Sequence, residues 1–132
     1  MVATAELSMR ECMTPTPHTI GMAQSIAFAA DLMRKHGIRH LPVLHGGEVL
    51  GIVSDRDVSL LSALDGVDAN EVTVEEAMTM EPYVVKPETK LAEVVHTMAD
   101  HKYGAALVME GNHVAGIFTT IDALRVLADV VK

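Results

Sequence analysis

The sequence predicts a mixed α/β fold in which two pseudo-symmetric β-α-β-β-α repeats pack sheet to sheet. Three observations predict it. A constant shift of 65 residues carries many residues of the first half onto identical residues of the second, with no gap. In each half, hydrophobic residues follow helical spacing and then strand spacing. Glycines mark turns at corresponding places in both halves.

The repeat covers most of the chain and sets the predicted domain boundaries. The shift relates Met13-Thr14 to Met78-Thr79, Pro17 to Pro82, Met33 to Met98, His36 to His101, Val43 to Val108, Gly46 to Gly111, Val49 to Val114, Gly51-Ile52 to Gly116-Ile117 and Asp57 to Asp122. Because a half of about 50 residues can hardly bury a three-stranded sheet and two helices alone, we expect the halves to pack together. The predicted division is a first domain at 7–64 with its lead-in helix, a linker at 65–73 and a second domain at 74–131.

Each repeat is expected to begin with a short strand and a helix. Thr19-Ile20 and Val84-Val85 predict the strands. Apolar residues at i, i+3, i+4 and i+7 predict one helical face, formed by Ile26, Ala29, Ala30 and Met33 in the first half and by Leu91, Val94, Val95 and Met98 in the second. Gly37 is expected to end the first of these helices, and Thr89 to cap the start of the other.

A hairpin and a second helix complete each repeat. Segments 41–44 and 49–53 are predicted strands joined at Gly46-Gly47. Segments 106–109 and 114–118 are their counterparts, joined through Gly111-Asn112. The second helices are then expected over 55–64 and 120–131.

Composition and charge narrow the class of protein. The formal net charge is −8, which makes nucleic acid an unlikely partner. Cys12 is the single cysteine and cannot form an internal disulfide, and no apolar run approaches the roughly 20 residues that cross a bilayer. The first residues lack the basic-then-apolar order of a signal peptide. We expect a soluble cytoplasmic protein with no membrane partner.

Two polar pairs lie where a predicted strand runs into a predicted helix. Ser54 and Asp57 are three residues apart, as are Thr119 and Asp122. Such a carboxylate can accept hydrogen bonds from a ribose diol. The hydroxyl and the free N–H groups of the first helical turn can hold a phosphate. The same spacing also forms a helix capping box, and one side chain can serve both roles.

The repeat resembles a tandem pair of cystathionine-β-synthase (CBS) domains, also called a Bateman module. The resemblance rests on Met13-Thr14, Gly37 to Val43 and Gly51 to Asp57, and on Met78-Thr79, Tyr103 to Val108 and Gly116 to Asp122. It implies a stand-alone regulatory module, not an enzyme, that binds AMP, ADP, ATP or S-adenosylmethionine as a regulatory ligand and requires no cofactor. It also implies a homodimer and a regulated partner protein. The alternative is a ligand-independent oligomerisation or protein-interaction module.

The resemblance also implies a nucleotide site in each half. In the first half its residues are Ile20, Arg39, His40, Leu41, Pro42, Ser54, Arg56 and Asp57. In the second half they are Val85, Lys86, Ala105, Ala106, Thr119 and Asp122. Arg39 and His40 are either phosphate ligands or solvated residues. The second half has no cation at 104–107, and its small residues either admit an adenine ring or close the pocket. The first-half site is therefore expected to prefer phosphorylated ligands.

Other chemistries are less well supported by the sequence. His36 and His40 have a helical metal-ligand spacing, but Gly37 lies between them and no cluster of Cys or carboxylates accompanies them, so no metal site is expected. No nucleophile, base and orienting acid come together around Ser54, and no catalytic residue is assigned. Apolar residues on the second helices support either dimerisation or internal packing: Leu60, Leu61, Leu64, Leu124, Val126 and Leu127.

Overall fold

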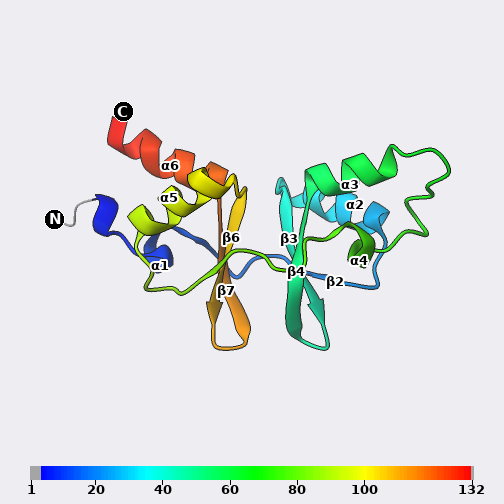
Figure 1. The fold of residues 1–132 in the computed structure, drawn as a ribbon, viewed down its shortest axis with the longest axis horizontal. Helices are drawn as coiled ribbons and strands as arrows, with labels where there is room; N and C mark the ends of the chain where they lie inside the picture. The colour runs from blue at the N-terminus through cyan, green and yellow to red at the C-terminus, as the bar shows by residue number, and fades with distance from the viewer. Residues whose placement is uncertain (1–3, 132) are drawn as a thin grey trace. The chain divides into compact units, whose positions relative to one another are not determined.

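The computed structural model describes residues 4–131 and divides into two units (Figure 1). Unit 1 combines Met1–Pro17 with Tyr83–Lys132, and unit 2 is His18–Pro82. Each unit holds one β-α-β-β-α repeat, which confirms the predicted mixed α/β fold. Among the helices of residues 4–131, none combines the length and the apolar character that crossing a membrane requires.

Unit 2 contains a three-stranded sheet and three helices. Its elements are β2 (Ile20–Gly21), α2 (Ile26–His36), β3 (His40–His45), β4 (Glu48–Ser54), α3 (Asp55–Ser62) and α4 (Val74–Ala77). The sheet order is β2-β3-β4, with β2 parallel to β3 and β3 antiparallel to β4. The predicted linker is attached to the start of α2, because the N–H groups of Ile26 and Ala27 donate to the carbonyls of Val72 and Ala69.

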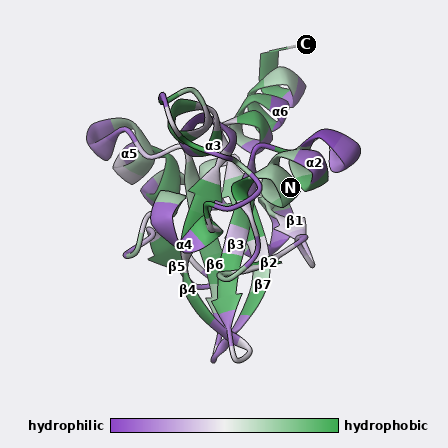
Figure 2. Cartoon of the chain, turned by 90° about the vertical axis from the view of Figure 1, so that its right-hand side faces the viewer, coloured by the Kyte–Doolittle hydropathy of each residue, from purple (hydrophilic) through white to green (hydrophobic). Residues whose placement is uncertain are grey.

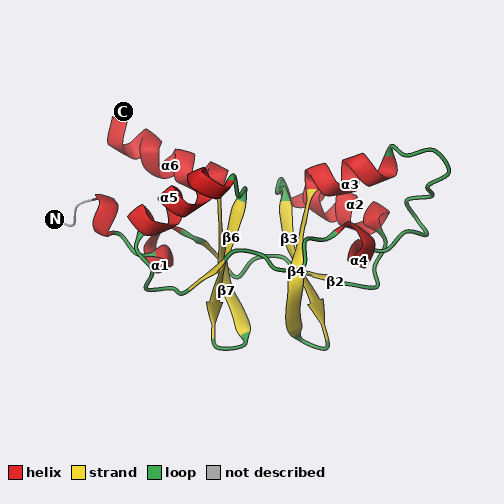
Figure 3. Ribbon diagram, viewed as in Figure 1, coloured by secondary structure: helices red, strands yellow, loops and turns green. Residues whose placement is uncertain are grey.

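Unit 1 repeats this arrangement with an additional strand. It contains a 3-10 turn (Thr4–Glu6), α1 (Met9–Cys12), β1 (Thr14–Pro15), β5 (Val84–Val85), α5 (Leu91–His101), β6 (Ala105–Glu110), β7 (His113–Thr119) and α6 (Thr120–Val131). The sheet order is β1-β7-β6-β5. Figure 3 shows the hairpin of β6 and β7 together with α5 and α6. As in unit 2, the short strand β5 is parallel to its neighbour β6, and β6 and β7 form an antiparallel hairpin.

The two repeats exchange their lead-in segments. Thr14 of the first repeat pairs with Ile117 of the second, and Thr79 of the second pairs with Ile52 of the first. The predicted boundaries follow the sequence repeat, whereas each structural unit joins one repeat to the lead-in of the other. No sequence periodicity distinguishes these two ways of pairing.

Glycines on β4 and β7 make room for the exchanged segments. A Cβ atom on Gly51 would overlap the carbonyl oxygen of Thr79. A Cβ on Gly116 would overlap the sulfur of Met13 and lie 2.8 Å from the carbonyl oxygen of Thr14. These glycines are therefore needed because another backbone passes directly over the strand.

Each unit has its own hydrophobic cluster. The cluster of unit 2 comprises Ile20, Ile26, Ala29, Met33, Leu41, Val43, Val53, Val58 and Val74. That of unit 1 comprises Met9, Val85, Leu91, Val94, Met98, Ala106, Val108 and Phe118. The predicted helical faces lie in these clusters, and the lead-in helices contribute Met9 and Val74. Figure 2 shows hydrophobic residues along the strands and hydrophilic residues at helix ends and hairpin tips.

The helix ends test two predictions about capping. Gly37 adopts the left-handed conformation after α2, with φ of 64°, which confirms it as the end of that helix. The prediction for Thr89 is wrong, because the N-cap of α5 is Lys90. The hydroxyl of Thr89 instead accepts a hydrogen bond from the N–H of Lys86 at 3.1 Å, which stabilises the turn before the helix.

Candidate functional site

In each unit the last strand of the hairpin continues directly into a helix, and the predicted polar pairs lie at this junction. In unit 2, His40 on β3 pairs with Ser54 on β4. The N–H of Asp55 donates to the carbonyl of Arg39 at 2.8 Å. The hairpin register therefore brings Arg39, His40, Ser54 and Asp57 to the same end of the sheet, next to the first turn of α3.

Ser54 and Asp57 form a capping box. The N–H of Asp57 donates to Ser54 Oγ at 3.0 Å, and the N–H of Ser54 donates to Asp57 Oδ2 at 3.3 Å. Asp57 is half-buried. Its second oxygen, Oδ1, accepts no hydrogen bond from the residues that the structure describes. The carboxylate thus caps α3 with one oxygen and keeps the other for a further donor.

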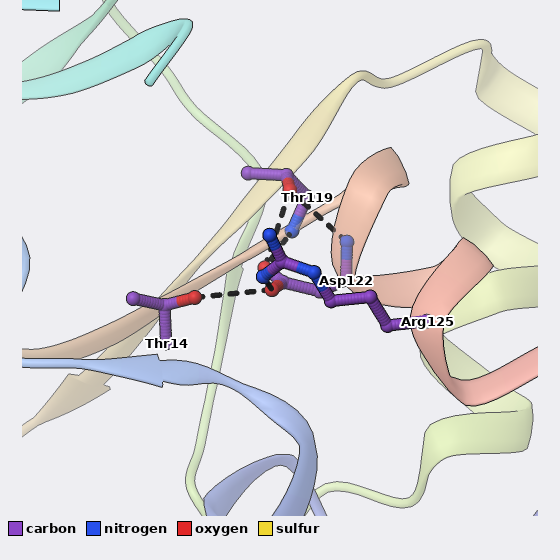
Figure 4. A network of polar contacts seen from close by, with 4 residues as sticks. All are labelled: Thr14, Thr119, Asp122 and Arg125. Atoms are coloured by element: carbon purple, nitrogen blue, oxygen red, sulfur yellow. Dashed lines mark hydrogen bonds and ion pairs between the residues drawn. The ribbon is translucent and has the colours of Figure 1, made fainter. Parts of the chain in front are cut away.

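Thr119 and Asp122 form the same box in unit 1, but further groups bind this carboxylate. The N–H and hydroxyl of Thr119 donate to Asp122 Oδ2 at 2.9 and 3.2 Å. The hydroxyl of Thr14 donates to Oδ1 at 3.0 Å, and Arg125 Nη1 lies 3.6 Å from the same oxygen (Figure 4). Asp122 is only 6% exposed. We call these four residues the Asp122 network.

His40 lies beside the capping box of unit 2 and is half-buried. Burial lowers the pKa of its imidazole, and the positive charge of Arg39 adds to this, while the carboxylates of Asp57 and Asp55 raise it. Its Nδ1 atom is buried and has no hydrogen-bond partner within the described part of the chain. Burial therefore favours the neutral ring and leaves it with one buried polar atom that no described group satisfies.

Several predicted site residues have buried side chains. Ile20, Leu41, Val85 and Ala106 belong to the hydrophobic clusters, and Leu41 and Ala106 are completely buried. Their role in a nucleotide site stays a prediction. Pro42 is also fully buried.

The other predicted residues lie nearer the surface. Arg39, Arg56 and Lys86 are exposed, and Ala105 is half-buried beside Thr119, its partner across the β6–β7 hairpin. Arg39 and Arg56 flank the capping box along the chain. Lys86 follows β5 at the other side of the sheet from β7. Among these predicted residues, the arginines of unit 2 therefore lie near its junction, whereas in unit 1 the cation beside the junction is Arg125, which the prediction did not include.

The sequence reasoning missed a hollow beside each junction. In unit 2 it has a volume of about 460 Å³ and its lining includes Arg34, Arg39, Asp55 and Ser59. In unit 1 the hollow is about 520 Å³, and the positions related to those four by the repeat carry Ala99, Gly104, Thr120 and Leu124. Comparing the two repeats position by position could have found this difference in polarity.

The histidines do not assemble into a metal site in the described residues. Across 4–131, no group of three or more His, Cys, Asp or Glu side chains is placed to hold a metal ion. The ring of His36 instead stacks on that of His18, with centroids 3.7 Å apart.

Comparison with known proteins establishes the family. The family model described as the CBS domain matches residues 9–63 and 74–129. The chain belongs to the CBS-domain family. The CBS domain-containing protein YhcV of Bacillus subtilis is 30% identical over 110 residues, which are 83% of this chain and 78% of YhcV. The double match confirms that the internal repeat is a pair of CBS domains.

Two solved structures similar to this chain carry ligands of different kinds. The CBS domain pair of protein MJ0100, in complex with 5′-methylthioadenosine and S-adenosyl-L-methionine, has a TM-score of 0.81 and 25% identity, covering 93% of this chain and 97% of that one. Hypoxic Response Protein I, with two coordinated zinc ions, has a TM-score of 0.77 and 26% identity, covering 89% and 97%. CBS-domain pairs are regulatory modules, and adenosine-type ligands occur among the neighbours of this chain.

Proposed function

We propose that this CBS pair binds an adenosine-containing ligand, such as AMP, ADP, ATP or S-adenosylmethionine, and thereby modulates the activity of a partner protein without catalysing a reaction. The ligands of the MJ0100 pair support the adenosine class. The observation that carries the proposal for this chain is the unpartnered Oδ1 of Asp57, at the start of α3 and beside Ser54 and His40.

The chemistry of this junction suits a ribose with a phosphate or another polar group. Asp57 Oδ1 can accept from a ribose hydroxyl, as the acidic residue does in dinucleotide-binding folds. The N–H groups in the first turn of α3 and the hydroxyl of Ser54 can face an oxyanion. The exposed guanidinium of Arg39 adds a positive charge close to the same place. We therefore favour phosphorylated ligands at this site.

Regulation then requires that the ligand prefers one arrangement of the protein over another. A ligand shifts such an equilibrium only by its difference in affinity for the two states.

We infer a homodimer in the cytoplasm as the functional form. Exposed apolar residues on α6 support an interface with a second copy: Ile121, Leu124, Leu127 and Val130.

A thermal-shift series with adenosine, AMP, ATP and S-adenosylmethionine tests the proposal. A ligand at 100 times its Kd stabilises the native state by about 2.7 kcal/mol, which raises the Tm by about 10 °C for a domain of this size. Asp57→Asn should reduce the rise by about half or more, since binding about tenfold weaker leaves about 1.4 kcal/mol of stabilisation at the same ligand concentration. Asp55→Asn, on the same helical turn, should keep the rise. If no adenosine compound shifts the Tm of the wild type, the ligand-independent interaction module is the correct interpretation.

A further inference from the structure

Asp122, the residue that corresponds to Asp57 in the second repeat, already accepts hydrogen bonds on both carboxylate oxygens. A carboxylate offers about four lone-pair positions. In the Asp122 network, Oδ2 accepts from the N–H and the hydroxyl of Thr119, and Oδ1 accepts from the hydroxyl of Thr14 and forms an ion pair with Arg125. Figure 4 shows Thr14, Thr119 and Arg125 around this side chain.

The contacts that Thr14 and Arg125 make with Asp122 have no equivalents at Asp57. The repeat places Thr79 at the position of Thr14, but within residues 4–131 its hydroxyl makes no hydrogen bond to Asp57. It places Leu60 at the position of Arg125, and this exposed side chain carries no charge. Each carboxylate therefore caps its own helix in the same way. The two differ in the contacts made by the residues at the positions of Thr14 and Arg125.

Burial adds to this difference. A ribose at Asp122 would have to displace the Thr14 hydroxyl and the Arg125 guanidinium from an oxygen of a side chain that is 6% exposed. It would gain hydrogen bonds no stronger than those it removed. At Asp57 the same hydroxyl meets an oxygen of a half-buried carboxylate and displaces nothing from the described protein groups.

We propose that the second repeat carries no ribose site: Asp122 connects β1 to α6 as an internal structural group, and each chain binds one adenosine ligand, at Asp57. This inference rests on the proposed function for its ligand. It specifies which of the two repeats binds the ligand and how many ligands each chain binds. It also specifies which residues prevent binding in the other repeat.

Titration calorimetry of the full chain with S-adenosylmethionine, and separately with AMP, tests the count. The wild type should bind one ligand per chain. Asp57→Asn should weaken binding at least about tenfold, the loss expected for one hydrogen bond to a charged group. Asp122→Asn and Thr14→Val should keep the count and change the affinity by less than about threefold, and Thr14→Val covers the case in which Asp122→Asn does not fold. Two ligands per chain, or a loss in Thr14→Val equal to that in Asp57→Asn, would overturn the inference.

Unfolding measurements separate a failure of this inference from a failure of the proposed function. Thr14→Val should lower the urea midpoint, whereas Thr79→Val, the matched change in the first repeat, should leave it unchanged. Equal midpoints for the two variants would contradict the structural role of Asp122 whether or not a ligand binds. A wild type that binds neither compound would refute the proposed function and the ligand count, while the comparison of Thr14→Val with Thr79→Val would still decide the role of Asp122.

Discussion

The strand–helix junctions of the two CBS repeats have the same backbone and the same polar pair, yet they present different chemistry. Asp57 caps α3 with one oxygen and leaves the other unpartnered, whereas Asp122 is buried with donors on both oxygens. Thr14 and Arg125 account for the difference. A family motif therefore locates a carboxylate, but its neighbours decide whether a ligand can reach it.

The largest expected effect concerns the exchanged lead-in segments, one of which carries Thr14 to Asp122. Gly51→Ala should destabilise the protein by about 3 kcal/mol and Gly116→Ala by about 2 kcal/mol. The first change is worse because its Cβ meets the rigid backbone of Thr79, while the second first meets the flexible side chain of Met13. Urea unfolding of both variants measures the difference. Gly21→Ala is the control, since its Cβ would lie 3.8 Å from the nearest atom, and equal losses at all three sites would contradict the exchange.

The fold was largely predictable because its signals are local. Apolar spacing predicted α2 and α5, and Gly46-Gly47 and Gly111-Asn112 predicted the hairpins, since helix faces and tight turns depend on residues close in sequence. The exchange of lead-ins was not predictable from these signals. Thr14 could pair with either repeat without any change in pattern, and only the glycines at 51 and 116 hinted at a close approach.

The helix ends give a smaller comparison between the repeats. Gly37 and Lys102 both adopt left-handed backbone after their helices, with φ of 64° and 60°. Lys102→Gly should therefore stabilise the protein by about 0.5 kcal/mol, and Gly37→Ala should destabilise it by about 1 kcal/mol. Thermal unfolding monitored by circular dichroism should show a higher Tm for Lys102→Gly and a lower Tm for Gly37→Ala. Lys102→Ala, which keeps the strain, is the control and should gain nothing.

Introducing the counterpart of Arg125 into the first repeat tests the comparison of the two carboxylates. Leu60→Arg gives the first repeat the arginine that Asp122 has in the second, and an exposed ion pair three residues along the helix should compete with the ligand. Binding of adenosine, chosen because it is uncharged, should weaken about threefold. Leu60→Gln should bind as the wild type does. Equal or tighter binding by Leu60→Arg would mean that Asp57 does not contact the ribose.

Candidate site residues were harder to predict than the elements that carry them. The capping pairs were visible in the sequence because their spacing is fixed by helix geometry. Whether Ile20 or Leu41 faces a ligand or the core depends on the packing of whole elements, and both proved to lie in the core. Arg125 lies three residues after Asp122 on the same helix, so this pair could have been recognised, but Thr14 is distant in sequence.

The smallest expected effect is a pH dependence confined to unit 2. Burial lowers the pKa of His40 in the folded state, so the unfolded chain binds the proton more readily. Stability should therefore be constant above the ordinary histidine pKa and should fall as the pH drops from there towards the lowered folded pKa. Urea unfolding at pH 7.5 and 5.5 should show a smaller acid loss in His40→Gln than in the wild type. The corresponding residue in unit 1 is Ala105, which does not titrate. An identical loss in both proteins would show that other groups cause the acid sensitivity.

A crystal structure of the chain grown with S-adenosylmethionine tests the central claim most directly. The account predicts a ribose within hydrogen-bond distance of Asp57 Oδ1, and an Asp122 that still accepts from Thr14 and Thr119 beside Arg125. A ribose bound at Asp122, with Thr14 displaced and Asp57 still only a helix cap, would contradict it.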